Sequence, residues 1–522
     1  MSTPPDRVGG AARNLLAGTA TKYVLLAANI AIGVLLMPFT MEHLGKAQYG
    51  LWMLVVSMTY YFQLLDLGYA SGLVRHITEV DAKGDERAVN EVVSTFFVVY
   101  TGIGSVALAG AVLLASFVIP RFPSIPPEHL RTAQLLVLIL GVRAAVGFPM
   151  TVFGAVATSR QAFALNGCIA IVSALTSALV TWFVLSAGHG LVTLVASTTA
   201  VSLVTYIAYA ASARHVFPAL RIRVSSFSRT RVREVTAFSA YVFLIDLAIQ
   251  LGFNVDNLVI GGALGTAAVA VYAVAHRLTE YQRQLCNQLN GMLFPVVVRF
   301  VATAPERLRV AATEATRVGF GLVIGVTACL VGFARPLVTA WMGPGFDEAV
   351  LPLYLLAMAS VVLVVQQPLG SVLMGAGRHR FVALVAIGEA LANVVISLLL
   401  VRRFGLAGVA FGTAAPVAVA NLAILMPAAC RTVGVSYLRF LALTSRPALI
   451  ALIPTVAAIA VLRSVASAAP SLLEVLSLGG CAAATYGLAF VTIGLPADVR
   501  ARYVAYIRDV FRKPRTLPAV NV

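Results

Sequence analysis

Charged residues are scarce in this sequence, and their scarcity identifies its class. Only 11% of the 522 residues are Asp, Glu, Lys or Arg, whereas 60% are hydrophobic. A soluble domain carries about 25% charged residues. The mean hydropathy is correspondingly high, at +0.91. The sequence therefore predicts an all-α polytopic membrane protein.

Motifs for catalysis, metal binding and nucleotide binding are also missing. The chain has no HExxH, no GxSxG and no phosphate-binding glycine loop, and its 5 cysteines lie in apolar runs without CxxC spacing. We therefore expect no enzyme, no metal site and no cofactor. Without an ATP site, any activity that needs energy would draw on an ion gradient, of H⁺ or Na⁺, or on downhill consumption of its product. No cleavable signal is expected, because the first apolar run continues to about residue 39.

Long apolar runs occupy most of the chain. A membrane-spanning helix needs about 20 apolar residues. On this criterion we predict fourteen spans, with the last pair the least certain: 14–40, 48–74, 92–119, 131–158, 163–187, 190–213, 233–262, 266–298, 314–342, 349–374, 380–401, 405–430, 441–463 and 471–495.

The net charge of +17 does not indicate nucleic acid, because the basic residues gather in short segments on alternate sides of the spans. One side holds only Lys46, Arg121, Arg131, Arg402, Arg403 and Arg463. Positive residues accumulate on the cytoplasmic side, so both termini are expected there. The basic runs 221–233 and 500–515 are expected to meet anionic lipid headgroups.

An internal repeat is visible at an offset of about 215–223 residues. The matching segments are Leu44-Gly45 with Leu264-Gly265, 159–163 with 377–381, and 189–191 with 404–406. Six spans separate each pair, so the halves share one orientation and predict two pseudo-symmetric six-helix lobes. The predicted domains are an N-terminal lobe at 1–213, a basic cytoplasmic linker at 214–232 and a C-terminal lobe at 233–430. Residues 431–522 add two transmembrane helices and a basic tail.

The stretch 241–299 is apolar enough for two spans, yet it carries Asp246, Asp256, Arg277, Glu280 and Arg283. An ionised group at the bilayer centre costs at least about 2.5–3.5 kcal/mol, so these side chains should avoid lipid. Helical spacing places polar side chains of each span in a stripe. The first comprises Asp246, Gln250, Asn254 and Asn257, and the second comprises Arg277, Glu280, Tyr281, Gln284, Asn287 and Gln288. Facing stripes predict the wall of an aqueous cavity.

Several short motifs resemble those of bacterial polysaccharide flippases. In the first half they are 49–52 (YGLW), 64–68 (LLDLG), Arg75 and 84–85, and in the second half Asp256, 259–261, 264–265, Tyr272 and 277–278. The family is the O-antigen flippase type of the multidrug/oligosaccharidyl-lipid/polysaccharide exporter superfamily, and the resemblance covers about residues 10–430.

The resemblance implies a V of two six-helix lobes, as in multidrug exporters, located in the bacterial inner membrane. The implied activity is ion-driven translocation of undecaprenyl-diphosphate-linked oligosaccharide from the cytoplasmic to the periplasmic leaflet, for lipopolysaccharide and other surface polysaccharides. Implied partners are this polyprenyl-diphosphate-linked glycan and a polysaccharide polymerase or glycosyltransferases.

A diphosphate crossing the bilayer needs cations along its path, and Arg suits phosphate through its bidentate fork. The candidates for substrate binding are Arg277, Lys22, Arg143, Arg283, Asn254 and Gln284. Each basic candidate has a structural alternative. Arg277 could pair with Asp246 or Glu280, Arg143 with Asp66, and Lys22 could extend toward the cytoplasmic surface.

Five acids are candidates for ion coupling: Asp66, Asp246, Asp256, Glu280 and Glu389. Asp66 and Asp246 could instead be counter-ions to cavity arginines. Asp256 lies near the expected outer end of its span, where a solvated carboxylate is the alternative. Glu389 could bond a neighbouring helix.

Two other functions fit the architecture less well. A multidrug antiporter of the same fold would favour acids and aromatics over cations, because its substrates are usually cationic. A membrane polymerase or ligase would need a sizeable outer loop, and the outer loops are short.

Overall fold

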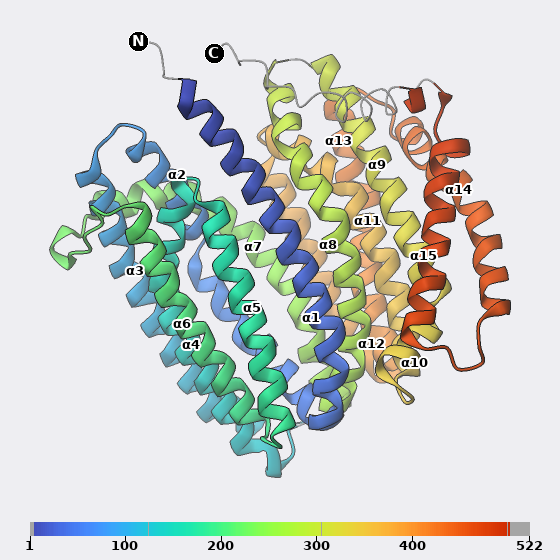
Figure 1. Ribbon diagram of the computed structural model, residues 1–522, viewed down its shortest axis with the longest axis horizontal. Helices are drawn as coiled ribbons and strands as arrows, with labels where there is room; N and C mark the ends of the chain where they lie inside the picture. Colours follow the sequence, from blue (N-terminus) through green and yellow to red (C-terminus); the bar gives the residue numbers. More distant parts are fainter. Residues whose placement is uncertain (1–4, 124, 304, 498, 502–522) are drawn as a thin grey trace. The chain divides into compact units, whose positions relative to one another are not determined.

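The structure is a computed structural model that describes residues 5–123, 125–303, 305–497 and 499–501. Side chains are described within these ranges except at 5–20, 237–242, 244–254, 288–303 and 305–307. The described residues form helices joined by short connections, with no strand among them (Figure 1). This confirms the all-α prediction.

The chain divides into two compact units, and both contain segments far apart in sequence. One is Met1–Val274 with Ala383–Pro416, and the other is Ala275–Val382 with Val417–Val522. Two helices pass from one unit into the other, α8 (Thr266–Thr303) and α12 (His379–Ala418). The lobe and linker boundaries expected from the repeat, and their arrangement in a V, stay predictions.

The first unit begins with a helix that reverses at a glycine. Helix α1 spans Pro5–Tyr60 but has non-helical backbone at Gly45, where φ is 75°. The 3₁₀ turn η1 (Tyr61–Asp66) follows it. The other helices of this unit are α2 (Tyr69–Asp81), α3 (Glu86–Leu113), α4 (Pro127–Ser159), α5 (Phe163–Ser186), α6 (Leu191–Val216) and α7 (Arg229–Leu264), with short turns at Leu114–Val118, Ile119–Arg121 and Val224–Ser226. The two arms of α12 on either side of Gly405, where φ is 56°, complete it.

Two apolar clusters hold these helices together. One joins α2, α3 and α4 through Leu73, Val89, Phe96 and Val152. The other joins the second arm of α1 to α4 and α6 through Leu51, Leu136 and Leu194, among others. All seven side chains are fully buried or nearly so, and burying a large apolar side chain contributes about 1.5–3 kcal/mol.

The second unit is also helical. It contains the main part of α8, then α9 (Pro305–Gly332), α10 (Ala334–Met342), α11 (Val350–Gly375), α13 (Met426–Val433), α14 (Tyr437–Val465) and α15 (Leu472–Ala489). Shorter turns lie at Asp347–Ala349, Val419–Leu425 and Phe490–Gly494. Helix α9 packs against α11 and α14, and α14 packs against α15.

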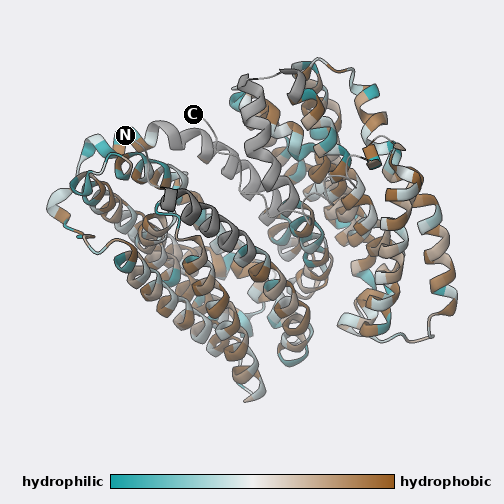
Figure 2. Ribbon diagram, turned by 45° about the horizontal axis from the view of Figure 1, so that its top comes forward, coloured by the Kyte–Doolittle hydropathy of each residue, from teal (hydrophilic) through white to brown (hydrophobic). Residues whose placement is uncertain are grey.

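The surfaces of these helices suit a lipid environment. Among the described residues, 10 helical stretches are long and apolar enough to cross a membrane. Large side chains such as Leu179, Phe183 and Ile207 are each 67% exposed, and hydrophobic colouring predominates along the long helices (Figure 2). The chain is therefore a multi-pass membrane protein. Two of the stretches, Thr21–Asp81 and His379–Val433, are 61 and 55 residues long, more than twice the roughly 20 residues that one span needs. The count of fourteen spans stays a prediction.

Candidate functional site

Asp256 on α7 is the most deeply buried acid among the described candidates. Its side chain is 2% exposed. The alternative of a solvated carboxylate at a helix end is therefore wrong. The sequence places residue 256 near the end of α7, but helices α8 and α12 of the same unit cover that end. A buried carboxylate needs compensating partners, because desolvation of an ionised group costs several kcal/mol.

Hydroxyl groups from two other helices supply these partners. Tyr272 on α8 donates its hydroxyl to Asp256 Oδ2 at 2.6 Å, and Thr413 on the second arm of α12 donates to the same oxygen at 2.8 Å. From the first arm, Asn393 Nδ2 donates to Thr413 Oγ1 at 3.0 Å. Ser397 Oγ lies 3.4 Å from Asn393 Oδ1 and extends the network. Hydrogen bonds at this site therefore link α7, α8 and both arms of α12.

The other carboxylate oxygen, Asp256 Oδ1, is buried and has no hydrogen-bond partner in the described part of the chain. A buried, unsatisfied carboxylate oxygen beside hydroxyl and amide oxygens is a favourable place for a proton or a small hard cation, since hard cations prefer oxygen ligands.

Close packing fixes α7 against the second arm of α1. Asn257 Nδ2, next to Asp256, donates to Ser57 Oγ at 2.8 Å. Two turns earlier on α1, Gly50 lies so close to the Thr266 carbonyl that a Cβ there would overlap it. The absence of a side chain at Gly50 thus lets α1 approach the start of α8. The second arm of α1 therefore packs closely against both α7 and α8, the helices that carry Asp256 and Tyr272.

Asp66 occupies a break in a helix. The backbone leaves helical geometry at Leu67 and Gly68, whose φ angles are 54° and 74°. Asp66 accepts hydrogen bonds from the Tyr100 hydroxyl at 2.7 Å and from the Ala70 backbone N–H at 3.2 Å. The alternative in which Arg143 pairs with Asp66 is not observed, because the hydrogen bonds to Asp66 in the described residues come from Tyr100 and Ala70. Leu67 is not a glycine, and such strained backbone in a membrane helix commonly marks a functional position.

In the second unit, Arg277 on α8 forms the centre of a polar stripe. Its Nη1 donates to Glu280 Oε2 at 3.0 Å, one of the two pairings expected from spacing. Gln284 Nε2 donates to Glu280 Oε1 at 3.0 Å, and the guanidinium lies 5.7 Å from the Tyr281 ring centroid. The Arg277 side chain is 41% exposed, so the pair leaves it accessible to a ligand.

The remaining candidates are scattered. Lys22 and Arg143 are exposed, with Lys22 Nζ 6.0 Å from the Phe163 ring centroid, while Arg283 and Glu389 are half-buried. Asp246 and Asn254 lie outside the residues whose side chains are described. The structure therefore brings Arg277, Glu280 and Gln284 together. Lys22 and Arg143 belong to the first compact unit.

Sequence reasoning missed the partners of Asp256. Thr413 and Asn393 are uncharged and sit in apolar spans, and Tyr272 entered the motif comparison without a role. A single polar residue in an apolar helix is a weak signal, because hydroxyl groups also bond their own helix. Thr413 does both, since it lies 3.3 Å from the Val409 carbonyl as well. No local pattern shows that residue 413 lies beside residue 256.

Comparison with known proteins agrees with this architecture. Residues 16–301 match the family model described as polysaccharide biosynthesis protein. The uncharacterized membrane protein EpsK of Bacillus subtilis is 23% identical over 383 residues, which is 71% of this chain and 74% of EpsK. The teichuronic acid biosynthesis protein TuaB of Bacillus subtilis is 28% identical over 159 residues, 29% of this chain and 32% of TuaB.

Solved structures of two transporter types share the fold. The inward closed conformation of the lipid II flippase MurJ matches with a TM-score of 0.69 at 12% identity, covering 95% of this chain and all of MurJ. An inward-facing MATE multidrug resistance transporter of the MOP superfamily matches with a TM-score of 0.66 at 16% identity, covering 78% of this chain and 95% of that one. These findings confirm the resemblance noted in the sequence: the chain belongs to the polysaccharide biosynthesis protein family and has the helical transporter fold of MurJ and MATE proteins.

Proposed function

We propose that this protein is a flippase that moves undecaprenyl-diphosphate-linked oligosaccharide from the cytoplasmic to the periplasmic leaflet of the bacterial inner membrane, driven by an ion gradient. Membership of the polysaccharide biosynthesis family supports transport of a lipid-linked substrate in general. The structural observation that carries the ion-driven part is Asp256, a carboxylate buried among hydroxyl and amide groups in a protein without an ATP site.

Arg277 is the proposed contact for the diphosphate. Its partner Glu280 neutralises the guanidinium while the site is empty, and Gln284 orients Glu280. A diphosphate carries more charge than one carboxylate and can engage the planar guanidinium through two oxygens. An arriving substrate would therefore displace Glu280 from Arg277, and Glu280 would keep its bond from Gln284.

Asp256 is the proposed coupling site. A Na⁺ ion or proton on its unsatisfied oxygen neutralises the carboxylate and strengthens the junction of α7, α8 and α12. A site that binds the ion in only one conformation biases the equilibrium between conformations by its differential affinity. In our proposal the two six-helix lobes, 1–213 and 233–430, alternate access through this bias.

Reconstituted transport tests the function directly. The purified protein is placed in liposomes with a fluorescent polyprenyl-diphosphate-linked disaccharide, and a membrane-impermeant quencher reports which leaflet holds the label. We expect flipping that accelerates under an imposed Na⁺ or H⁺ gradient. Extrusion of cationic dyes without flipping of the glycolipid would refute the proposal and favour a multidrug antiporter.

A further inference from the structure

The connection between α6 and α7 is a fixed strap. The segment 217–228 lies along α3, where three side chains hold its backbone. Asn90 donates to the Ala219 carbonyl at 2.9 Å and accepts from the Arg221 N–H at 2.7 Å. Ser94 accepts from the Arg223 N–H and Thr95 from the Ser228 N–H, both at 3.0 Å. The strap therefore presents its outward side chains from a defined position.

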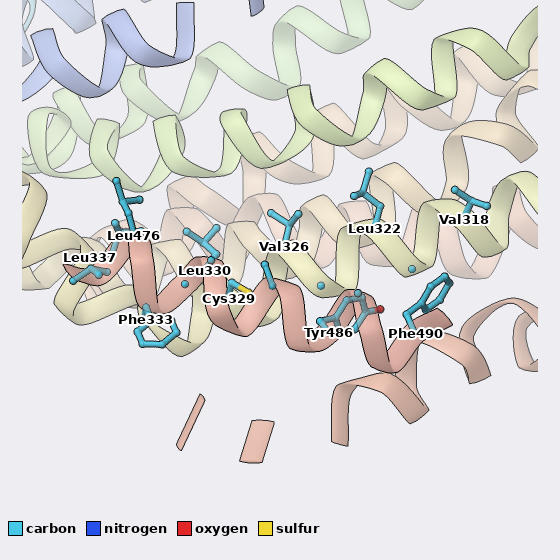
Figure 3. Close-up of a pocket in the computed structure, with 17 residues that line it drawn as sticks. Val318, Leu322, Val326, Cys329, Leu330, Phe333, Leu337, Leu476, Tyr486 and Phe490 are labelled. Carbon is cyan, nitrogen blue, oxygen red and sulfur yellow. The ribbon is translucent and has the colours of Figure 1, made fainter. Parts of the chain in front are cut away.

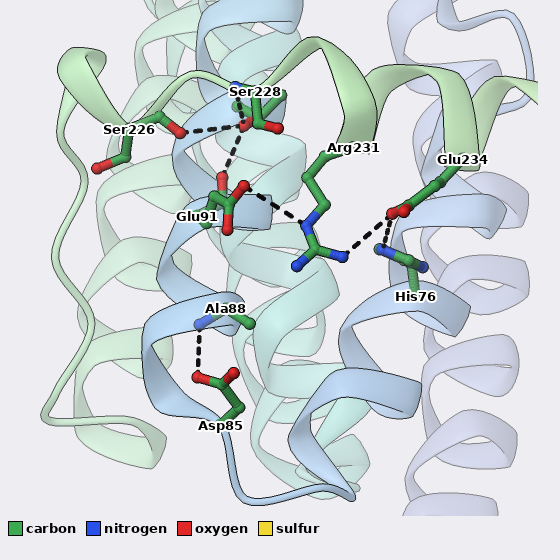
Figure 4. A network of polar contacts seen from close by, with 9 residues as sticks. His76, Asp85, Ala88, Glu91, Ser226, Ser228, Arg231 and Glu234 are labelled. Carbon is green, nitrogen blue, oxygen red and sulfur yellow. Dashed lines mark hydrogen bonds and ion pairs between the residues drawn. The ribbon is translucent and has the colours of Figure 1, made fainter.

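The first turns of α7 carry their arginines on two faces with different environments. Arg231 is neutralised: its Nη1 donates to Glu234 Oε2 at 3.1 Å and its Nε lies 3.6 Å from Glu91 Oε1. His76 Nε2 lies 3.1 Å from the same Glu234 oxygen (Figure 4). This network links α7 to α2 and α3, and it engages both Glu91 and Glu234.

Arg229 and Arg233 lie on the other face. They are one turn apart and exposed, and neither has an ion-pair partner among the side chains that the structure describes. Together with Val232, Thr236 and Phe227 of the strap, they border a shallow, open pocket of about 410 Å³ whose lining is mostly apolar. Two unneutralised guanidinium groups on one side of a pocket favour an anion, and their spacing at i and i+4 lets both reach one ligand.

The pocket also has an apolar side. Phe227 is 42% exposed and Val224, earlier on the strap, is 71% exposed. The positive-inside distribution assigns this end of α7 to the cytoplasmic surface, at headgroup level. Apolar side chains held outward between arginines fit the boundary between headgroups and acyl chains better than they fit bulk water.

We propose that Arg229, Arg233 and Phe227 form a binding site for the phosphate headgroup of a lipid in the cytoplasmic leaflet. The arginines bind phosphate oxygens, and Phe227 with Val232 packs against the first carbons beyond the phosphate. That the headgroup is the diphosphate of the transported glycolipid rests on the proposed function, whereas the phosphate chemistry does not. The site is separate from Arg277, which belongs to the other compact unit.

Lipid binding to the full-length protein in phosphatidylcholine nanodiscs tests the proposal. The probes are geranylgeranyl diphosphate, dioctanoyl phosphatidylglycerol and inorganic phosphate. The variant R229Q/R233Q removes two charges from the pocket. The matched control R221Q/R223Q removes two charges from the exposed part of the strap and leaves the pocket intact. We expect R229Q/R233Q to raise the Kd of both lipid probes by about tenfold or more, the equivalent of about 1.4 kcal/mol, and the control to change it by less than about twofold.

Each possible result of the binding experiment leads to a different conclusion. Equal weakening of lipid binding by both double variants would show that net charge alone attracts the lipids, and it would overturn the site. Unchanged lipid binding in R229Q/R233Q would also overturn it. So would binding of inorganic phosphate as tight as that of the lipids. Stronger binding of the diphosphate than of phosphatidylglycerol identifies the substrate headgroup, and equal binding identifies a resident phospholipid. Because binding is measured without transport, failure of flipping with intact binding counts against the proposed function and leaves this site standing.

Discussion

Replacing Asp256 by Asn separates an ion-coupling role from a structural role. The amide has the same shape, and its oxygen can still accept from the Tyr272 and Thr413 hydroxyls. It has no charge, however, so it cannot hold a cation or titrate. In our proposal the coupling ion loses its charged ligand in this variant, and a loss of about 3 kcal/mol in ion binding would lower affinity about a hundredfold, because each 1.4 kcal/mol is about tenfold. We therefore expect D256N to weaken ion-driven flipping by about a hundredfold or more.

The stability of D256N should move in the opposite direction from its activity. Since burial of an ionised carboxylate costs several kcal/mol, the neutral amide should leave the free energy of unfolding unchanged or slightly higher. Tyr272→Phe is the converse variant. It removes the 2.6 Å hydrogen bond to the carboxylate, and bonds to charged groups contribute about 1.5–3 kcal/mol. We expect Y272F to unfold at lower temperature while its flipping still responds to the gradient.

Both variants are measured in two assays. Thermal unfolding in detergent gives stability, and gradient-driven flipping in liposomes, with Na⁺ and H⁺ gradients imposed separately, gives coupling. The reasoning fails if D256N flips at the wild-type rate and still responds to both gradients. It also fails if D256N loses activity only because it no longer folds, since the carboxylate would then be structural.

Two further predictions concern other parts of the chain. Arg277→Ala should abolish export of lipid-linked glycan while the protein remains in the membrane, because Glu280 and the diphosphate lose their shared partner; normal surface polysaccharide in cells that carry only this variant would contradict the role. Gly50→Ala should destabilise the fold by about 1–3 kcal/mol, because the new Cβ overlaps the Thr266 carbonyl. Gly102→Ala is the matched control, since nothing lies within 4 Å of a Cβ there, and equal unfolding temperatures for the two variants would refute the packing argument.

The positions of the helices could be predicted from the sequence because composition and length decide them. The predicted span 163–187 is observed as Phe163–Ser186, and 441–463 as Tyr437–Val465. One pair of motifs matched across the repeat also coincides with unusual backbone conformations. Gly45 and Gly265, matched across the repeat, both have positive φ, at 75° and 93°, where a side chain would be strained. Apolar runs and glycines carry this information locally, so no knowledge of tertiary contacts is needed.

The surroundings of the acids could not be predicted, because they depend on contacts between distant segments. A helical projection gives the direction in which Asp256 points relative to its neighbours on α7, but it does not show which helix lies opposite. Thr413 and Asp256 are separated by 157 positions in the sequence. The predicted span 48–74 runs through Asp66, yet the chain leaves helical geometry at Leu67 and Gly68. Gly68 by itself does not show that Leu67 also adopts a positive φ.

Asp66 and Asp256, two candidate acids of the first unit, differ in their surroundings in a way that suits a switch. Asp66 sits at a broken helix and accepts two hydrogen bonds, whereas Asp256 keeps one oxygen unsatisfied in a rigidly packed junction. The bond between Ser57 and Asn257 connects the two regions, because Ser57 lies just before the 3₁₀ turn that leads to Asp66. If Asp256 binds the coupling ion as proposed, the change of charge acts on a helix that is bonded to the segment just before this break. Rigid coupling at one point and a break a few residues away is the arrangement that converts a local change of charge into movement of a whole helix.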